Sequence, residues 1–178
     1  MVSPLRKFFR TKALKKYASG IRTGIIPLSL MRDVFILIDS RDQNAATCVA
    51  LIKEFFHRNG IKPDIFYIDT GTCKGRKKRL DTDPMYTFQK KDLNWYGRLR
   101  KNVLQSFLTA GQDLYIDLTI RNDFPVRFIG TAIPAKFKVG CTGKGKNIFD
   151  MTITTPSGSE VSSTELFRGI SALLMSVK

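Results

Sequence analysis

Three aspartates, Asp39, Asp69 and Asp117, lie at the ends of short apolar runs, in VFILID, IFYID and LYID. Apolar runs of this length are typical of strands that are buried on both faces of a parallel sheet. Because ligands of such sheets bind outside the carboxyl ends of the strands, we expect these carboxylates at one rim. Together with neighbouring basic groups they could hold a metal ion with a phosphate, or a sugar phosphate.

The predicted rim mixes acidic, hydroxyl and basic side chains. Its members are Asp39, Ser40, Arg41, Asp69, Asp117, Thr119, Arg121, Asp123 and Lys144. The ligand class that suits them is a phosphorylated small molecule, such as a nucleotide or a sugar phosphate. The alternative needs no ligand, because aspartate at a strand end commonly serves turns and helix caps.

Sequence motifs with a defined chemistry are absent. There is no Walker P-loop, no complete G-x-G-x-x-G pattern and no G-x-S-x-G elbow. His57, the single histidine, stands beside Arg58 near an expected helix end and is interpreted as a surface cap rather than a base. None of the three cysteines, Cys48, Cys73 and Cys141, is in a C-x-x-C pair. We therefore expect no dedicated metal site and no cofactor, and the catalytic residues, if any, are unknown.

The first 32 residues form a second candidate site, because they carry basic residues and no acidic one. Pro4 and Gly20 are typical helix boundaries, and Leu5, Phe8 and Phe9 are spaced to share one side of a helix. A basic amphipathic helix of this kind can lie on an anionic membrane surface or on nucleic acid. The alternative is a helix that docks on the domain through its phenylalanines and leaves its lysines in water. The cations chosen as binding candidates are Arg6, Lys7, Arg10, Lys12, Lys15 and Lys16.

A third candidate is the basic loop after the second expected strand. It contains Lys74, Arg76, Lys77, Lys78 and Arg79. Basic runs contact phosphates without sequence preference, although many are merely solvated. Trp95, the single tryptophan, could stack on a base, but its favoured role is an apolar anchor beneath this loop.

Two strand–helix–strand units are predicted to position these residues. The first comprises 34–38, 44–59 and 65–68, and the second lies within 113–140. The other expected elements are a short strand at 85–88, a helix at 103–110, a last strand at 149–154 and a helix from Ser163 or Thr164 to Val177. An antiparallel direction at an edge of the sheet is open for the last strand.

The pattern predicts one three-layer, Rossmann-like α/β domain over residues 33–178, with a mostly parallel sheet and helices on both faces. Residues 1–32 add the basic amphipathic helix and a loop.

The chain resembles an uncharacterised family of short bacterial α/β proteins over nearly its whole length. The resemblance rests on the basic N-terminal helix, VFILIDS, KKDLNWYG, DLYIDLTIRNDFPVRFIG and PAKFKVG, in this order. It implies a fold and a length, but no activity.

Residues 113–140 are also similar to the acceptor-side, Rossmann-like half of heptosyltransferase-like glycosyltransferases. A strand ending in Ile-Asp-Leu there leads to a helix and then to a basic strand ending in glycine. Those enzymes need a second Rossmann-like domain for the nucleotide-sugar donor, for which 178 residues leave no room. The similarity therefore implies the sheet and little of the chemistry.

The formal net charge of +15 favours anionic partners, although simple solubility is the alternative. Our leading hypothesis is a non-enzymatic, cytoplasmic binding protein for a membrane surface or nucleic acid, peripheral at the inner membrane surface in the former case. One alternative is a small enzyme or binding domain for a phosphorylated small molecule at the rim. Another is a scaffold or half-enzyme that pairs with a second chain. No run of about 20 apolar residues exists, so we expect no transmembrane segment.

Overall fold

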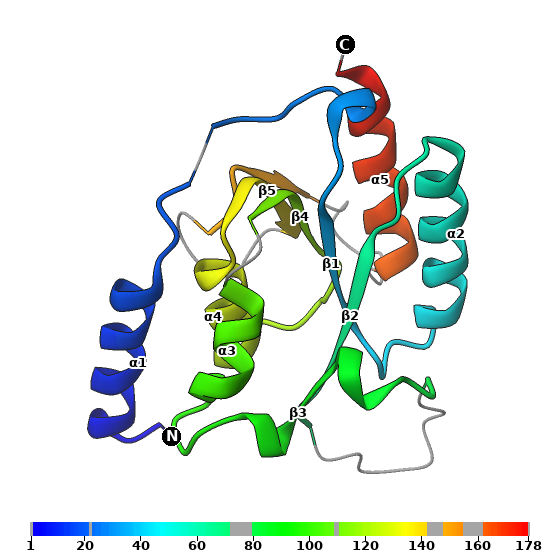
Figure 1. The fold of residues 1–178 in the computed structure, drawn as a ribbon. Helices are drawn as coiled ribbons and strands as arrows, with labels where there is room; N and C mark the ends of the chain where they lie inside the picture. Colours follow the sequence, from blue (N-terminus) through cyan, green and yellow to red (C-terminus); the bar gives the residue numbers. More distant parts are fainter. Residues whose placement is uncertain are drawn as a thin grey trace.

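A six-stranded, wholly parallel sheet forms the centre of the computed structural model, with strand order β3-β2-β1-β4-β5-β6 (Figure 1). The structure describes residues 2–21, 23–71, 80–108, 111–141, 148–154 and 162–177, without the side chains of residues 106 and 107. The strands are β1 (Val34–Asp39), β2 (Asp64–Asp69), β3 (Thr87–Gln89), β4 (Gln112–Asp117), β5 (Ala135–Cys141) and β6 (Met151–Ile153).

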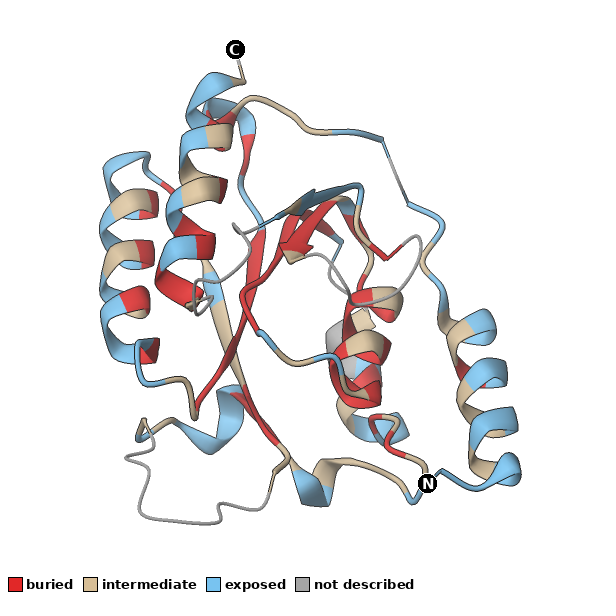
Figure 2. Ribbon diagram, turned by 180° about the vertical axis from the view of Figure 1, so that it is seen from behind, coloured by how far each residue is buried: buried red, intermediate tan, exposed pale blue. Residues whose placement is uncertain are grey.

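The central strands β1 and β4 are buried along their whole length, as the red ribbons in Figure 2 show. Their apolar runs explain this position, because a strand covered by helices on both faces needs apolar side chains in both directions. The edge strands β3 and β6 are short, at three residues each.

Helices cover both faces of the sheet and complete a three-layer, Rossmann-like domain (Figure 1). One face carries α2 (Ala45–Arg58) and α5 (Ser163–Ser176), with the short helix η1 (Leu28–Leu30). The other face carries α1 (Pro4–Tyr17), α3 (Lys101–Leu108) and α4 (Phe124–Ala132). Two further short helices, η2 (Pro84–Tyr86) and η3 (Lys90–Asp92), flank β3. The predicted fold class is confirmed.

Two local expectations change. The last strand is parallel to β5, not antiparallel, because Asp150 is anchored beside Lys138: their backbones bond at 2.9 Å and the Asp150 carboxylate accepts from the Lys138 amide at 2.8 Å. The final helix is capped by Ser162 rather than Ser163 or Thr164, and the Ser162 hydroxyl accepts from the Glu165 amide at 3.2 Å. Ser163 and Thr164 are instead buried in the first turn.

Helix α1 docks against α4 and the segment around Tyr96. Ala13 is buried there, and the ring of Phe9 stacks on that of Tyr96 with centroids 5.8 Å apart. Beyond the helix, the Ser19 amide donates to the Thr131 carbonyl at 3.0 Å. The helix is therefore fixed to the domain by ring contacts and backbone bonds. No helix among the described residues is long and apolar enough to cross a membrane.

Candidate functional site

The sheet order creates a switch point between β1 and β4. From β1 the chain proceeds to β2 and β3 on one side, and β4, β5 and β6 continue on the other. Neighbouring loops therefore diverge at the carboxyl ends of β1 and β4, which is where parallel sheets of this kind bind ligands. Asp39 ends β1 and Asp117 ends β4, so the structure places both aspartates at this point.

Asp39 is bound by two arginines. Its carboxylate accepts from Arg41 at 3.2 Å (Nε) and 3.1 Å (Nη2), and lies 3.5 Å from Nη1 of Arg121. Only 12% of the Asp39 side chain is exposed, so water screens these interactions weakly. A partly buried carboxylate shared between two guanidinium groups is the centre of the rim.

Arg121 joins three loops. Its Nη2 donates to Thr70 Oγ1 at 2.8 Å, after β2, and also to the carboxylate of Asp123. Asp123 is in turn the N-cap of α4, because its Oδ1 accepts from the Val126 amide at 3.3 Å. A single side chain thus connects the ends of β1 and β2 with the start of α4.

Predicted rim residues that follow β1 and β4 also make contacts of their own. Thr119 donates to Asp117 Oδ1 from its amide at 2.9 Å and from its hydroxyl at 2.8 Å, inside the protein. Ser40 Oγ lies 3.4 Å from the Ile68 carbonyl. Ile68 is the register partner of Asp39, so the alternation of side chains turns Asp69 to the opposite face of the sheet. Lys144 lies outside the described residues.

Gly71 has a role at the rim that the sequence did not reveal. A Cβ atom built at residue 71 would lie 1.8 Å from Nη1 of Arg41, so the guanidinium occupies the space of a side chain. Nothing in the local sequence of Gly71 indicates this close approach. Within the described residues no cluster of three or more His, Cys, Asp or Glu side chains could hold a metal ion. What the rim offers is two guanidinium groups, which fit carboxylate or phosphate oxygens.

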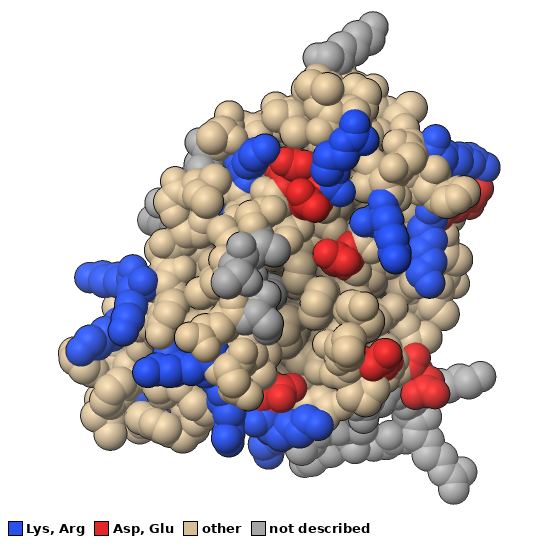
Figure 3. Space-filling view, viewed as in Figure 1, with Lys and Arg blue, Asp and Glu red and all other residues tan. Residues whose placement is uncertain are grey.

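The predicted cations of α1 divide into two sets. Lys7, Lys12, Lys15 and Lys16 are exposed, whereas Arg6 and Arg10 are partly buried toward the domain. Arg10 Nε donates to the Tyr96 carbonyl at 2.8 Å, and its guanidinium lies 4.6 Å from the centre of the Phe124 ring. Figure 3 shows basic side chains over α1, a helix that contains no acidic residue.

Apolar side chains accompany the lysines. Leu5 and Phe8 are each 61% exposed, and Trp95 is 57% exposed beside Phe9, at 5.4 Å between ring centroids. Of the alternative in which α1 docks through both phenylalanines, the structure shows the part for Phe9 alone, which faces Tyr96. Trp95 is also more exposed than the favoured role of an apolar core anchor requires, and it packs against Phe9 and Tyr96 beside α1. The basic loop from Lys74 to Arg79 lies outside the described residues.

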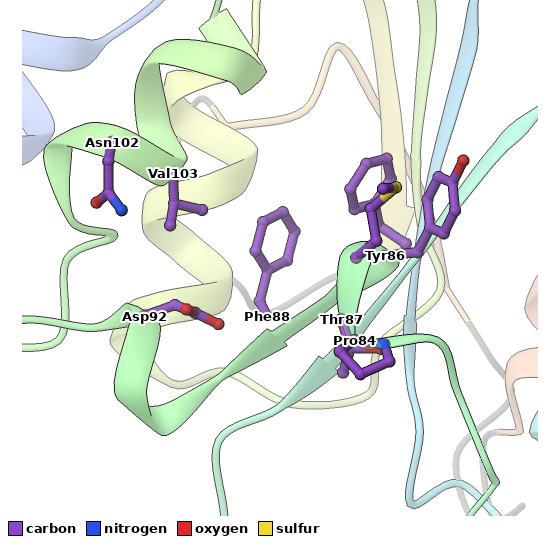
Figure 4. A pocket seen from close by; sticks show the side chains of 9 residues that line it. Pro84, Tyr86, Thr87, Phe88, Asp92, Asn102 and Val103 are labelled. Atoms are coloured by element: carbon purple, nitrogen blue, oxygen red, sulfur yellow. The ribbon is translucent and has the colours of Figure 1, made fainter.

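A separate pocket of about 500 Å³ lies beside the edge strand β3 (Figure 4). Its walls are mainly apolar and aromatic, from Phe66, Tyr86, Phe88 and Val103. None of the predicted site residues lines it.

Comparison with known protein families gives a match over most of the chain. The model of a family of unknown function, DUF6913, matches residues 6–170 of the 178-residue chain. Among curated proteins and among solved structures nothing matches. The matched stretch contains the six described strands and most of α1 and α5. The chain therefore belongs to DUF6913, a family of unknown function.

Proposed function

We propose that the protein binds an anionic lipid surface through the outward face of α1. We call this face the α1 surface and define it by Leu5, Lys7, Phe8, Lys12, Lys15, Lys16 and the neighbouring Trp95. The observation that carries the proposal is that large apolar side chains remain exposed among lysines on a helix whose other side is docked.

Docking gives the α1 surface a fixed orientation. Arg98 Nη1 donates to the Tyr17 hydroxyl at 2.8 Å near the end of the helix, while Phe9 and Arg10 contact Tyr96 nearer its start. A docked helix with solvated lysines would need no exposed Leu5 or Phe8. These two side chains gain free energy only where an apolar medium or partner receives them.

The energies suit reversible membrane association. A lysine close to an anionic leaflet contributes about 1 kcal/mol, so the four lysines together contribute about 4 kcal/mol. Full burial of a leucine or phenylalanine side chain adds about 1.5–3 kcal/mol. The segment that carries Trp95 adds further exposed cations, which are Lys90, Lys91, Arg100 and Lys101.

Nucleic acid is the competing anionic partner. An exposed aromatic such as Trp95 can stack on a base. Leu5 has no planar face for stacking, however, and Phe8 lies beside it at i+3 on the helix. This combination favours the acyl region of a lipid surface over a nucleic acid strand.

The test is sedimentation of the full chain with vesicles of phosphatidylglycerol and phosphatidylcholine, compared with phosphatidylcholine alone. We expect binding to the anionic vesicles only. Replacing Lys12, Lys15 and Lys16 by Gln should reduce it at least tenfold, and a Leu5→Ser/Phe8→Ser variant should also reduce it at least tenfold.

The control variants remove exposed cations and an exposed apolar side chain that lie away from the α1 surface. Lys53, Lys62 and Arg168 are exposed cations away from the α1 surface, and Leu30 is an apolar side chain that is 63% exposed. Their replacement by Gln and by Ser, respectively, should leave vesicle binding unchanged. Equal loss in both triple variants would show a non-specific charge effect and refute the proposal. Binding to single-stranded RNA but not to vesicles would replace the lipid with a nucleic acid.

A second candidate function rests on the rim. Two guanidinium groups meet at Asp39 at the switch point, and a phosphorylated small molecule could take the place of this carboxylate. A thermal-shift screen of nucleotides and sugar phosphates tests it. A true ligand at 100 times its Kd stabilises the fold by about 2.7 kcal/mol. Arg121→Gln should abolish that shift, and a screen without any shift removes this candidate.

A further inference from the structure

A pocket of about 460 Å³ lies between α1 and the start of α4, and it meets the Asp39 network at Asp123. Helix α1 contributes Lys7, Arg10 and Thr11 to its lining, and α4 contributes Arg127. Asn122 lines the pocket just before α4 begins. This volume lies within the range of small-molecule sites in proteins.

The cationic side chains that line this pocket outnumber the carboxylates that could neutralise them. Burial and the charge of Arg6 lower the pKa of Arg10, and Arg127 acts in the same direction against the opposing effect of Asp123. The carboxylate of Asp123 is already paired with Arg121. Lys7, Arg10 and Arg127 therefore lie around one cavity whose lining carboxylate has another cationic partner.

One hydrogen-bond donor of a lining residue is also available. The Nε atom of Arg127 is buried and has no hydrogen-bond partner among the described residues. The positive end of the α4 dipole points to the same place, since Asp123 is its N-cap. An anion in the pocket could accept a hydrogen bond from Arg127 and would reduce the repulsion between Arg10 and Arg127.

We infer that this pocket binds a phosphate group, in the form of a phosphomonoester. Guanidinium groups supply paired N–H donors that fit phosphate oxygens. The exposed ammonium group of Lys7 supplies a further positive charge to the pocket lining. The inference rests on Arg10 and Arg127, so it does not depend on the proposed lipid binding. The phosphate can belong to a lipid headgroup or to a soluble molecule.

The experiment titrates inorganic phosphate into the full chain and follows backbone amide shifts by NMR at constant ionic strength. We expect the saturable shifts to be centred on α1 and the start of α4. Arg127→Gln should weaken the affinity at least tenfold, Lys7→Gln severalfold, and Arg127→Lys should retain part of it. The control Arg168→Gln removes the same charge from the opposite face and should leave the Kd unchanged.

Two vesicle preparations then distinguish the sources. One contains phosphatidate, a phosphomonoester lipid, and the other contains phosphatidylglycerol at equal surface charge. Tighter binding to phosphatidate that Arg127→Gln abolishes identifies a lipid headgroup, whereas equal binding to both identifies a soluble phosphate. A phosphate Kd that is the same in Arg127→Gln and Arg168→Gln, or shifts spread over all cations, overturns the inference. Lys7→Gln changes an exposed residue and should leave the fold intact. If Arg127→Gln disturbs folding, the phosphate affinity of Lys7→Gln is compared with that of the parent instead.

Discussion

Asp113, at the start of β4, joins three segments through its carboxylate. It accepts hydrogen bonds from Lys136 Nζ at 2.7 Å and from the amides of Arg32 and Asp33 at 2.8 and 3.2 Å. Burial alone would raise the pKa of Asp113, but these bonds and the charge of Lys136 outweigh it and lower the pKa from its ordinary value. Because the folded-state pKa is the lower one, the stabilisation is complete above the unfolded-state pKa and is lost as pH falls through the folded-state pKa.

We expect Asp113→Asn to reduce the free energy of unfolding by about 1.5–3 kcal/mol at pH 7, the range for hydrogen bonds to a charged group. The difference from the parent should begin to shrink below about pH 4, where the carboxylate of the unfolded chain gains its proton, and should vanish once the pH falls below the lower folded-state pKa. Urea denaturation from pH 7 to pH 2.5 measures this. Asp64→Asn, an exposed carboxylate at the start of β2, is the control. A difference between Asp113→Asn and the parent that persists unchanged at pH 2.5 would contradict the electrostatic explanation.

The site residues show which individual roles a sequence can reveal. Aspartates at strand ends are visible as a local pattern, and the structure joins Asp39 to Arg41 and Arg121 as residues of one rim. The face that each aspartate occupies depends on the register between strands, so the separate position of Asp69 was not predictable. Arg127 lies within an apolar helical pattern, and only the docking of α1 places it beside other cations.

At the scale of elements, α1 was predictable as a helix but not in its orientation. Either of two sets of apolar residues could face the domain. One set is Leu5, Phe8 and Phe9, and the other is Phe9, Ala13 and Tyr17. The second set docks because Tyr96 receives Phe9 and Arg98 receives Tyr17. These partners lie far along the chain, so no local periodicity distinguishes the two sets.

Adjacent phenylalanines provide the test of this docking. Phe9→Ala removes the contacts with Tyr96 and Trp95 and should lower the free energy of unfolding by about 1–2 kcal/mol. Phe8→Ala removes an exposed ring and should change it by at most about 0.5 kcal/mol. Urea denaturation and hydrogen exchange of the α1 amides measure the two variants. Equal effects, or faster exchange of α1 in Phe8→Ala, would show that the helix docks differently.

The whole molecule carries a formal net charge of +15, which should affect its stability as well as its binding. Like charges repel in the compact state, and salt screens them. We expect the Tm to rise by several degrees between 20 mM and 300 mM NaCl. The rise should be smaller in the Lys12/Lys15/Lys16→Gln variant, which lowers the charge from +15 to +12. Calorimetry at the two salt concentrations measures it. A Tm that falls with salt would mean that attractive pairs such as Asp113–Lys136 outweigh the repulsion.

The fold of the whole molecule was predictable because the sequence patterns that indicate it lie within single strands and helices. Continuous apolar runs separated by helical patterns specify buried parallel strands, whatever their order in the sheet. The direction of β6 was not predictable, since it depends on the bonds between Asp150 and Lys138 rather than on its own three residues.

The docking of α1 has a consequence for the order of events during synthesis. Arg10 contacts a carbonyl 86 residues later in the chain, and Tyr17 contacts a side chain 81 residues later. At a ribosomal rate of about 5–20 residues per second, α1 waits for several seconds before its docking partner leaves the ribosome. During this interval the face that will later be covered, with Phe9, Ala13 and Tyr17, is exposed together with all the basic residues of the helix. The nascent chain therefore presents a more strongly amphipathic cationic helix than the folded protein does.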